Sequence, residues 1–179
     1  MRLFFAVTPP DHVRAKIAHW QQLWSKSVHN VKWVKEENLH LTLKFLGEVV
    51  PTQLDQVVSA ARSALVGHPA FALVVGGTGV FPHPRRARVL WLGLKDDAGQ
   101  LARLQQYLDR SLSNLGFPSE NKPFAPHLTL GRLRQPSEVT RPVFPAENLI
   151  LPVNSIILYE SILKSHGPLY KPLATFKLQ

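Results

Sequence analysis

One tetrapeptide occurs twice in this chain, and the spacing of its two copies constrains the fold. His-Leu-Thr-Leu stands at positions 40–43 and again at positions 127–130, so the copies lie 127 − 40 = 87 residues apart. Each copy sits in an apolar segment, residues 39–46 and residues 126–133, where leucines alternate with His and Thr. Alternation with a period of two is typical of a strand with one buried face. The sequence therefore predicts two equivalent strands.

The correspondence extends beyond the tetrapeptide. Under the same shift of 87, the apolar residues 3–7 fall on residues 90–94, and residues 11–24 fall on residues 98–111, which both have a helical pattern. Two long copies are too few for a solenoid. We expect instead a bilobal domain with pseudo-two-fold symmetry and a central cleft, its repeats covering about residues 1–82 and 88–179. Each repeat is about half of a typical domain, so neither is expected to fold alone.

Strand-like segments outnumber helical ones, and the helices do not alternate regularly with them. This order favours a single α+β domain over residues 1–179, with two mainly antiparallel sheets and helices packed outside. In the first helix, Ile17, Trp20 and Trp24 recur at helical spacing and are expected to face the core. Residues 1–7 are interpreted as the first strand and not as a signal peptide, because the Thr-Pro-Pro-Asp that follows ends the apolar run too early.

Composition narrows the classes of partner. No apolar run approaches the roughly 20 residues of a membrane span, so no membrane partner is expected. The absence of cysteine excludes disulfides, thiolate zinc sites and a cysteine nucleophile, and fits a cytoplasmic protein. A formal charge of +9 and a pI of about 10.2 favour an anionic partner, with nucleic acid first. The alternative is a basic surface that only aids solubility.

The duplicated strands carry a set of groups that suits phosphate chemistry. Residues i and i+2 of a strand share a face, so His40 and Thr42 point together, as do His127 and Thr129. Histidine titrates near pH 6.5, so one ring can act as a base while its partner acts as an acid. The Thr hydroxyls can donate to phosphate oxygens. A lone His-x-Thr would be an ordinary surface or core feature; its duplication favours the catalytic interpretation.

Zinc is the main chemical alternative. Zinc usually takes three or four protein ligands, whereas His40 and His127 have no third ligand at a recognisable spacing. The remaining histidines show no paired pattern; they are His12, His19, His29, His68, His83 and His166. We therefore expect neither a metal nor a cofactor.

Several basic residues are candidates for binding the phosphate. Lys44 has the strand parity of His40 and is expected to face the cleft, unless it is a solvated lysine at a strand end. Its counterpart Gly131 would leave room for substrate. Arg132 points away from His127 by simple parity, and only a bulge or twist would bring it to the phosphate. The basic run at residues 83–88 either holds RNA phosphates or is a solvated loop between the lobes.

Aromatic residues near the motifs leave two interpretations open. Phe5 shares the parity of its apolar neighbours and is more typical of the core than of a base-stacking platform. Tyr159, Ser161 and Tyr170 either line the cleft or pack in the core, and the sequence favours the core.

The two His-Leu-Thr-Leu motifs and the segments around them resemble those of the 2H phosphoesterases. More narrowly, they resemble those of the bacterial and archaeal RNA 2′,3′-cyclic phosphodiesterases, also called 2′-5′ RNA ligases. The similar segments are residues 2–6 (RLFFA), 38–47 (NLHLTLKFLG), 88–93 (RVLWLG), 126–132 (PHLTLGR), 158–163 (LYESIL) and 167–170 (GPLY). The similarity extends over nearly the whole chain and implies the 2H phosphoesterase fold.

The resemblance implies hydrolysis of an RNA-terminal 2′,3′-cyclic phosphate to a 2′-phosphate. It implies that His40 is the proton donor and His127 the proton acceptor. The phosphate-binding residues expected beside them are Thr42, Thr129, Arg132 and Lys44. The reverse reaction, 2′-5′ ligation, is expected to be minor because water is abundant. The expected partner is RNA with a cyclic phosphate end, with tRNA fragments as one candidate, and the protein is expected to be a monomer.

Two other functions are compatible with the same residues. The first is a phosphodiesterase for small cyclic nucleotides, which the charge of +9 disfavours. The second is a non-catalytic RNA-binding module, which the absence of RNP-like aromatic motifs disfavours.

Overall fold

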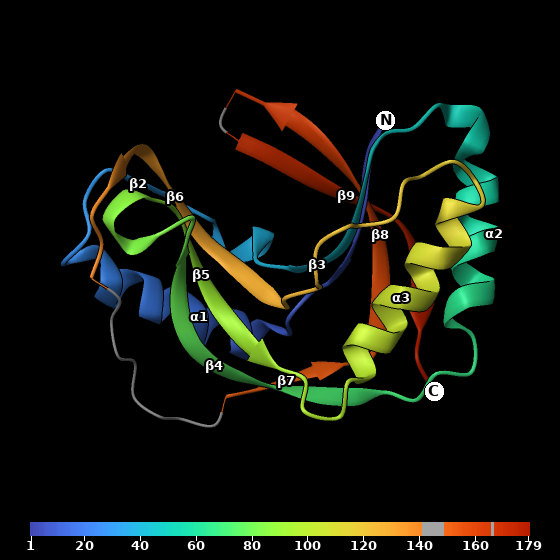
Figure 1. The fold of residues 1–179 in the computed structure, drawn as a ribbon, viewed down its shortest axis with the longest axis horizontal. Coiled ribbons are helices and arrows are strands. Elements are labelled where there is room, and N and C mark those ends of the chain that lie inside the picture. The colour runs from blue at the N-terminus through green and yellow to red at the C-terminus, as the bar shows by residue number, and fades with distance from the viewer. Residues whose placement is uncertain (141–148, 166) are drawn as a thin grey trace.

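The computed structural model describes residues 1–140, 149–165 and 167–179, so His166 lies outside the described residues. The elements in chain order are β1 (Arg2–Val7), α1 (Asp11–Ser25), β2 (Val31–Trp33), η1 (Glu36–Asn38), β3 (Leu41–Glu48), η2 (Pro51–Gln53), α2 (Leu54–Leu65), β4 (Phe71–Phe81), η3 (Pro84–Arg86), β5 (Ala87–Lys95), α3 (Gln100–Ser113), β6 (His127–Ser137), β7 (Ile150–Val153), β8 (Ser155–Lys164) and β9 (Gly167–Lys177). Helices and strands are interleaved without a regular alternation and the strands outnumber the helices, so the predicted α+β class and first strand are confirmed (Figure 1).

The strands form one curled antiparallel sheet in the order β7-β4-β5-β6-β3-β1-β8-β9, with β2 paired to β6. The central neighbours β6 and β3 pair at a single position, Leu41 with Leu128. The two expected antiparallel sheets are therefore two halves of one sheet, joined where the repeated tetrapeptides meet. Under the shift of 87, β1 corresponds to β5 and β3 to β6, so the strand order is pseudo-symmetric about its centre.

Each half of the sheet contains strands from both halves of the sequence. β4 lies beside β5 and β8 lies beside β1. This differs from the expectation that each repeat builds its own lobe, with residues 83–88 between the lobes. That stretch instead connects β4 to β5, which are antiparallel neighbours; a short connection keeps such strands adjacent.

The helices are exchanged in the same way. The amide of Gln21 on α1 donates to the carbonyls of Val34 at 2.9 Å and Leu130 at 2.8 Å, which places α1 against β6. On the other side, α3 packs against β3 through Lys44 and Asp109. Figure 1 shows α2 alongside α3, at the end of the molecule away from α1. Each repeat thus supports the motif strand of the other with its helix.

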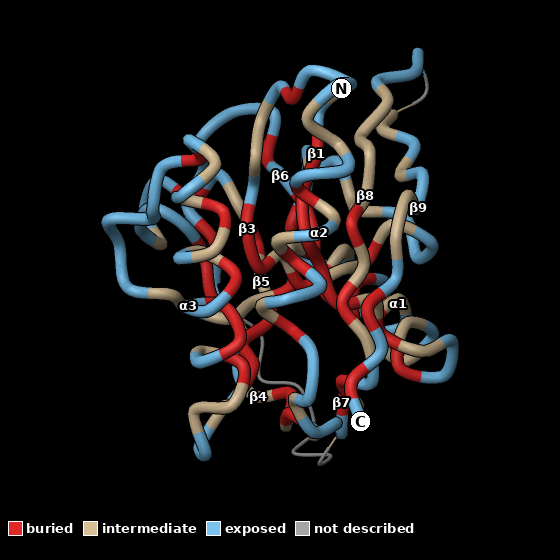
Figure 2. The backbone as a smooth tube through the Cα atoms, turned by 90° about the vertical axis from the view of Figure 1, so that its right-hand side faces the viewer, coloured by how far each residue is buried: buried red, intermediate tan, exposed pale blue. Residues whose placement is uncertain are grey.

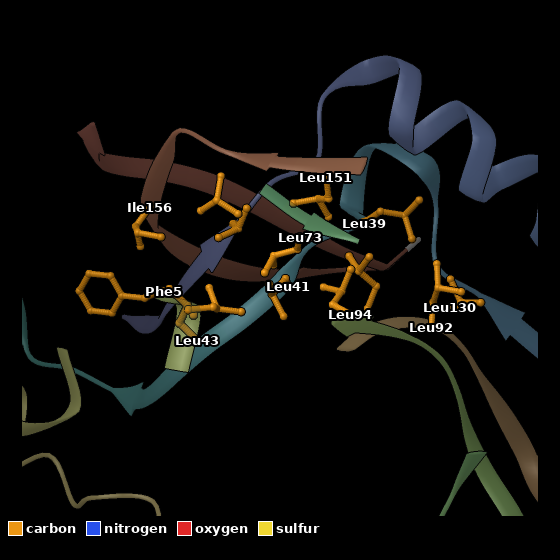
Figure 3. Packing of buried hydrophobic residues seen from close by; sticks show 14 of the residues in the cluster. Phe5, Leu39, Leu41, Leu43, Leu73, Leu92, Leu94, Leu130, Leu151 and Ile156 are labelled. Carbon is orange, nitrogen blue, oxygen red and sulfur yellow. The ribbon is translucent and has the colours of Figure 1, made fainter. Parts of the chain in front are cut away.

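The leucines of both tetrapeptides lie in the core. Leu41, Leu43, Leu128 and Leu130 are all buried, as the alternation predicted. Figure 3 shows Leu41 and Leu43 among the buried side chains of the sheet, and Figure 2 shows buried backbone following the strands. Each such side chain contributes roughly 1.5–3 kcal/mol through burial. The buried face anchors both strands, so their opposite faces are free to carry polar groups.

The apolar face of α1 is also confirmed, because Ile17, Trp20 and Trp24 are buried. Within the described ranges, none of the helices has both the length and the apolar character that crossing a membrane would require.

Candidate active site

The two motifs meet on one face of the sheet. Leu41 pairs with Leu128 in antiparallel register, and one further step on either side places His40 opposite Thr129 and Thr42 opposite His127. Opposed side chains on neighbouring strands have Cβ atoms about 4.5–5.5 Å apart, and diagonal neighbours lie about 7–8 Å apart. The two imidazoles are therefore diagonal neighbours, each facing the hydroxyl-bearing residue of the other motif.

Both imidazoles are oriented by the same backbone contact. Nδ1 of His40 lies 2.7 Å from the carbonyl oxygen of Asn38, and Nδ1 of His127 lies 2.8 Å from that of Ala125. A carbonyl only accepts hydrogen bonds, so each Nδ1 carries the proton. Nε2 of each ring is then the atom that exchanges a proton with a reactant.

Aromatic rings enclose His40. Its ring centroid lies 5.0 Å from that of Phe4 and 5.1 Å from that of Tyr170. Burial lowers the pKa of His40; the hydrogen bond to Asn38 acts to raise it, and the charge of His127 lowers it further. The influence of one imidazole on the other is the electrostatic sign that they share a site.

His127 has an equivalent aromatic frame. Its ring lies 5.3 Å from Phe81 and 6.2 Å from Trp91, which occupies the position equivalent to Phe4 because 4 + 87 = 91. A Cβ on Gly79 would lie 1.9 Å from Cζ2 of Trp91, so that glycine lets the indole cross β4. The sequence did not predict that Phe4 and Trp91 would flank the two histidines, although the shift of 87 makes their positions equivalent.

The first motif contains a bulge. β1 pairs Ala6 with Thr42 and Phe5 with Lys44, so Leu43 is an extra residue on β3. An extra residue inverts the alternation of side chains beyond it. Parity counted from the histidine therefore fails from position 44 onward.

The prediction that Lys44 binds phosphate is wrong for this reason. Its side chain is 2% exposed, and its Nζ contacts the carboxylate of Asp109 and donates to the carbonyl of Pro118 at 2.7 Å. Phe45 instead faces outward, 59% exposed, with its ring 5.8 Å from Phe4. Lys44 anchors the motif strand to α3 and to the loop that leads to the second motif.

The second motif has a matching bulge. Trp91 pairs with Thr129, but the preceding residue of β5 pairs with Gly131, so Leu130 is the extra residue. The inversion of parity turns Arg132 toward the face that carries Thr129. Arg132 needs a bulge of this kind in order to approach the phosphate, as expected from its position in the sequence.

The charge of Arg132 reaches the site. Burial raises the pKa of Tyr170, and the nearby positive charges of Arg132 and Arg2 act in the opposite direction; the Tyr170 ring is the one that lies 5.1 Å from His40. Gly131 does not leave room for substrate as expected. A Cβ there would lie 2.6 Å from Cγ1 of Val31, so the glycine allows β2 to pair with β6.

The remaining candidates divide between core and cleft. Phe5 is fully buried, as predicted. Tyr159 stacks on Phe4 with ring centroids 5.5 Å apart, and Ser161 pairs with Tyr170 across β8 and β9. Tyr159 and Tyr170 therefore belong to the aromatic rings around His40. The sequence had favoured the core for both.

No group of three or more His, Cys, Asp or Glu that could hold a metal ion occurs among residues 1–140, 149–165 and 167–179. Metal independence nevertheless stays a prediction.

Known proteins show which family this chain is similar to. Residues 9–154 match the model of the 2′-5′ RNA ligase superfamily. The chain is 33% identical to the RNA 2′,3′-cyclic phosphodiesterase of Methanothermobacter thermautotrophicus over 184 residues, covering 99% of each chain. It is 36% identical over 181 residues to the protein of that name from Archaeoglobus fulgidus, covering 99% of this chain and all of the relative.

Solved structures agree with this placement. TT0787 of Thermus thermophilus superposes with a TM-score of 0.87 at 32% identity, over 99% of this chain and 98% of that one. E. coli LigT complexed with 3′-AMP gives a TM-score of 0.85 at 32% identity, over 99% of this chain and 97% of that one. Sequence and fold together show that the chain belongs to the 2′-5′ RNA ligase superfamily of 2H phosphoesterases.

Proposed function

We propose that this protein hydrolyses the 2′,3′-cyclic phosphate at the end of an RNA to a 2′-phosphate, with two histidines as acid and base and without a metal. Relatives named RNA 2′,3′-cyclic phosphodiesterase support a phosphoric diester hydrolase. The structure of a relative, E. coli LigT, was solved in complex with 3′-AMP, which supports a nucleotide as the ligand. The observation that carries the proposal is the pair of imidazoles on one face, each with Nδ1 fixed on a backbone carbonyl.

The reaction is a displacement at phosphorus. Nε2 of His127 accepts a proton from a water molecule as the water oxygen bonds to phosphorus. The bond from phosphorus to the ribose 3′ oxygen breaks, and Nε2 of His40 donates its proton to that oxygen. The products are a 2′-phosphate and a free 3′ hydroxyl, and proton exchange with solvent restores both rings. Each transfer contributes typically about 10²–10⁴-fold.

Three side chains stabilise the charge that builds on the phosphate. The hydroxyls of Thr42 and Thr129 donate to its non-bridging oxygens, and the guanidinium of Arg132 supplies positive charge. Donors that are held in place before the reaction avoid the cost of reorganisation during it. Lys44 has no part in this step, because it is buried against Asp109.

The environment of His40 makes its role depend on the substrate. Burial lowers the pKa of the free imidazole, which opposes the protonated form that a donor needs. An anionic phosphate beside the ring favours that form. Binding of the anionic substrate thus favours the protonated form of His40, which is the form that donates the proton.

Other features follow from the same chemistry. The reverse reaction would join a cyclic end to a 5′ hydroxyl, as a minor 2′-5′ ligation. We also propose that residues 1–179 act as one domain, since both halves of the sheet need strands from both repeats. Cytoplasmic location, a monomeric state and tRNA fragments as substrate stay predictions from the sequence.

The test uses an RNA ending in a 2′,3′-cyclic phosphate, incubated with the protein in EDTA. We expect a 2′-phosphate product, and we expect His40→Ala and His127→Ala each to reduce kcat/KM by at least about 10²-fold. His29→Ala, which removes an exposed histidine outside the motifs, serves as the control. Absence of product in EDTA, or near-normal rates in both motif variants, would refute the proposal.

A further inference from the structure

We propose that the RNA leading to the cyclic end lies along β6, on a cationic surface that runs away from the histidines. The inference rests on the proposed function and names the part of the protein that binds the RNA body. We call this surface the β6 track; it consists of Lys32, Arg132, Arg134, Arg85 and Arg86.

Strand pairing sets the first part of the track. Lys32 on β2 is the register partner of Arg132 on β6, so their side chains point to the same face. Arg134 follows two residues later, about 6.5–7 Å further along that face. Its backbone N–H donates to the carbonyl of Asn30 at 3.1 Å, so β2 still accompanies the strand there. All three basic residues are exposed, whereas Leu133 between the arginines is buried.

The connection between β4 and β5 supplies the far part. The backbone N–H of Val139 donates to the carbonyl of Pro84 at 2.9 Å, which holds η3 beside the end of β6. Arg85 and Arg86 on η3 are exposed. Figure 1 shows β2, the outer end of β6 and the loop between β4 and β5 gathered at the end of the molecule away from α2 and α3.

The charges of the track are available to a ligand. β6 has no acidic residue in its sequence HLTLGRLRQPS. Within the described part of the chain, no carboxylate forms an ion pair with any of the five track residues. Buried or partnered cations elsewhere behave differently: Lys44 contacts Asp109, and Arg14 contacts Asp11. A row of unpaired cations favours a polyanion.

The pseudo-symmetry gives the track its direction. Under the shift of 87, Arg132 and Arg134 correspond to Phe45 and Gly47 on β3, and the next residue of β3 is Glu48. The equivalent stretch of the first copy therefore has a phenylalanine and a glutamate in place of two arginines, and the register partner of Glu48 on β1 is Arg2. The path along β6 thus carries a row of unpaired cations, whereas Arg2 on the path along β3 lies beside Glu48.

The length of the track predicts which substrates use it. From His127 to Ser137 is ten steps along β6, or roughly 33 Å at about 3.3 Å per residue. A mononucleotide occupies only the end of the track beside the histidines. The value of kcat/KM should therefore rise with the number of nucleotides that precede the cyclic phosphate.

The experiment compares a 2′,3′-cyclic mononucleotide with oligonucleotides of increasing length that end in the same group. We expect kcat/KM to rise with length in the wild type. In the double variant Lys32→Ala/Arg134→Ala, the ratio of oligonucleotide to mononucleotide kcat/KM should fall by about tenfold at low salt. For the oligonucleotide, the magnitude of the slope of log kcat/KM against log salt should decrease by about 1.4, which is about 0.7 for each lost phosphate contact. Arg103→Ala/Arg110→Ala on α3 removes the same charge from another surface and should leave the ratio unchanged.

The outcomes separate this inference from the proposed function. If the wild type cleaves mononucleotide and oligonucleotides equally well, the track is refuted while the hydrolase stands. An equal loss in the α3 control also refutes it, because net charge alone would explain the effect. If no substrate is cleaved, binding of a fluorescent oligonucleotide ending in a 3′-phosphate decides: a loss confined to the track variant supports the track, and equal binding by all three proteins overturns it.

Discussion

The two copies of the repeat share a backbone and differ in side chains. In both, the histidine Nδ1 contacts the carbonyl two residues earlier, and a bulge follows at Leu43 or Leu130. The duplication thus preserves the geometry that orients the imidazoles. The feature common to both copies, a histidine held by its Nδ1 on a backbone carbonyl, is the feature that proton transfer requires.

The copies differ directly after the bulge. The residue following it is Lys44 in one copy and Gly131 in the other, and the next is Phe45 or Arg132. The first copy gains a buried ion pair and an aromatic surface, whereas the second gains a close contact with β2 and an exposed cation. A symmetric scaffold therefore carries an asymmetric site, in which one copy is enclosed and the other attracts anions.

Removing the buried cation should have the largest effect on stability. In Lys44→Met, Asp109 and the carbonyl of Pro118 lose their partner. Breaking a fully buried ion pair typically costs about 3–5 kcal/mol; because Asp109 is only partly buried, we expect a loss of about 2 kcal/mol in the free energy of unfolding, measured by urea denaturation at pH 7. Lys26→Met on the exposed end of α1 should change it by less than about 0.5 kcal/mol. Equal stabilities of the two variants would show that the ion pair does not anchor the first copy.

The same ion pair predicts a dependence on pH. Desolvation raises the pKa of Asp109, but hydrogen bonds from Lys44, Ser119 and the backbone of Glu120 outweigh it, and the pKa is lowered overall from 3.8. The carboxylate therefore contributes stability above its unfolded pKa, and that contribution is lost as the pH falls through the lower folded value. Lys44→Met should unfold less steeply with acid than the wild type.

Exchanging the next position between the copies should have the second largest effect. Arg132→Phe puts the residue of the first copy into the second and removes the positive charge at the phosphate. We expect kcat/KM for a cyclic mononucleotide to fall by about 10²-fold, as when a preorganised charge-stabilising donor is lost. The reciprocal change, Phe45→Arg, should alter it by less than about threefold. Similar losses in both variants would mean that position 132 has no special role in the reaction.

The sequence predicted the parts of the fold that follow local rules. Alternation identified the buried leucines around His40 and His127, and the shift of 87 correctly made their strands equivalent. Local patterns do not specify partners, however. For that reason the sequence did not predict that α1 supports β6, or that β8 returns to lie beside β1.

The bulges explain the one wrong site residue. Leu43 and Leu130 continue the apolar alternation, so nothing in their identity marks an extra residue. Counting parity across them placed Lys44 in the cleft, when it is buried, and turned Arg132 away from the face it shares with Thr129. The structure resolves both, because strand pairing records the inserted residue directly.

The smallest effect should come from opening the enclosure of His40, because this changes protonation without removing a reacting group. Burial lowers the pKa of His40, and Tyr170→Ala exposes the ring to water, so the pKa should rise. A proton donor loses activity as the pH rises through its pKa. The alkaline limb of the kcat/KM profile should therefore move to higher pH, whereas Phe81→Ala, beside His127, should leave that limb in place. If the acidic limb moves instead in Tyr170→Ala, His40 is the base, and the two copies have exchanged the roles assigned to them.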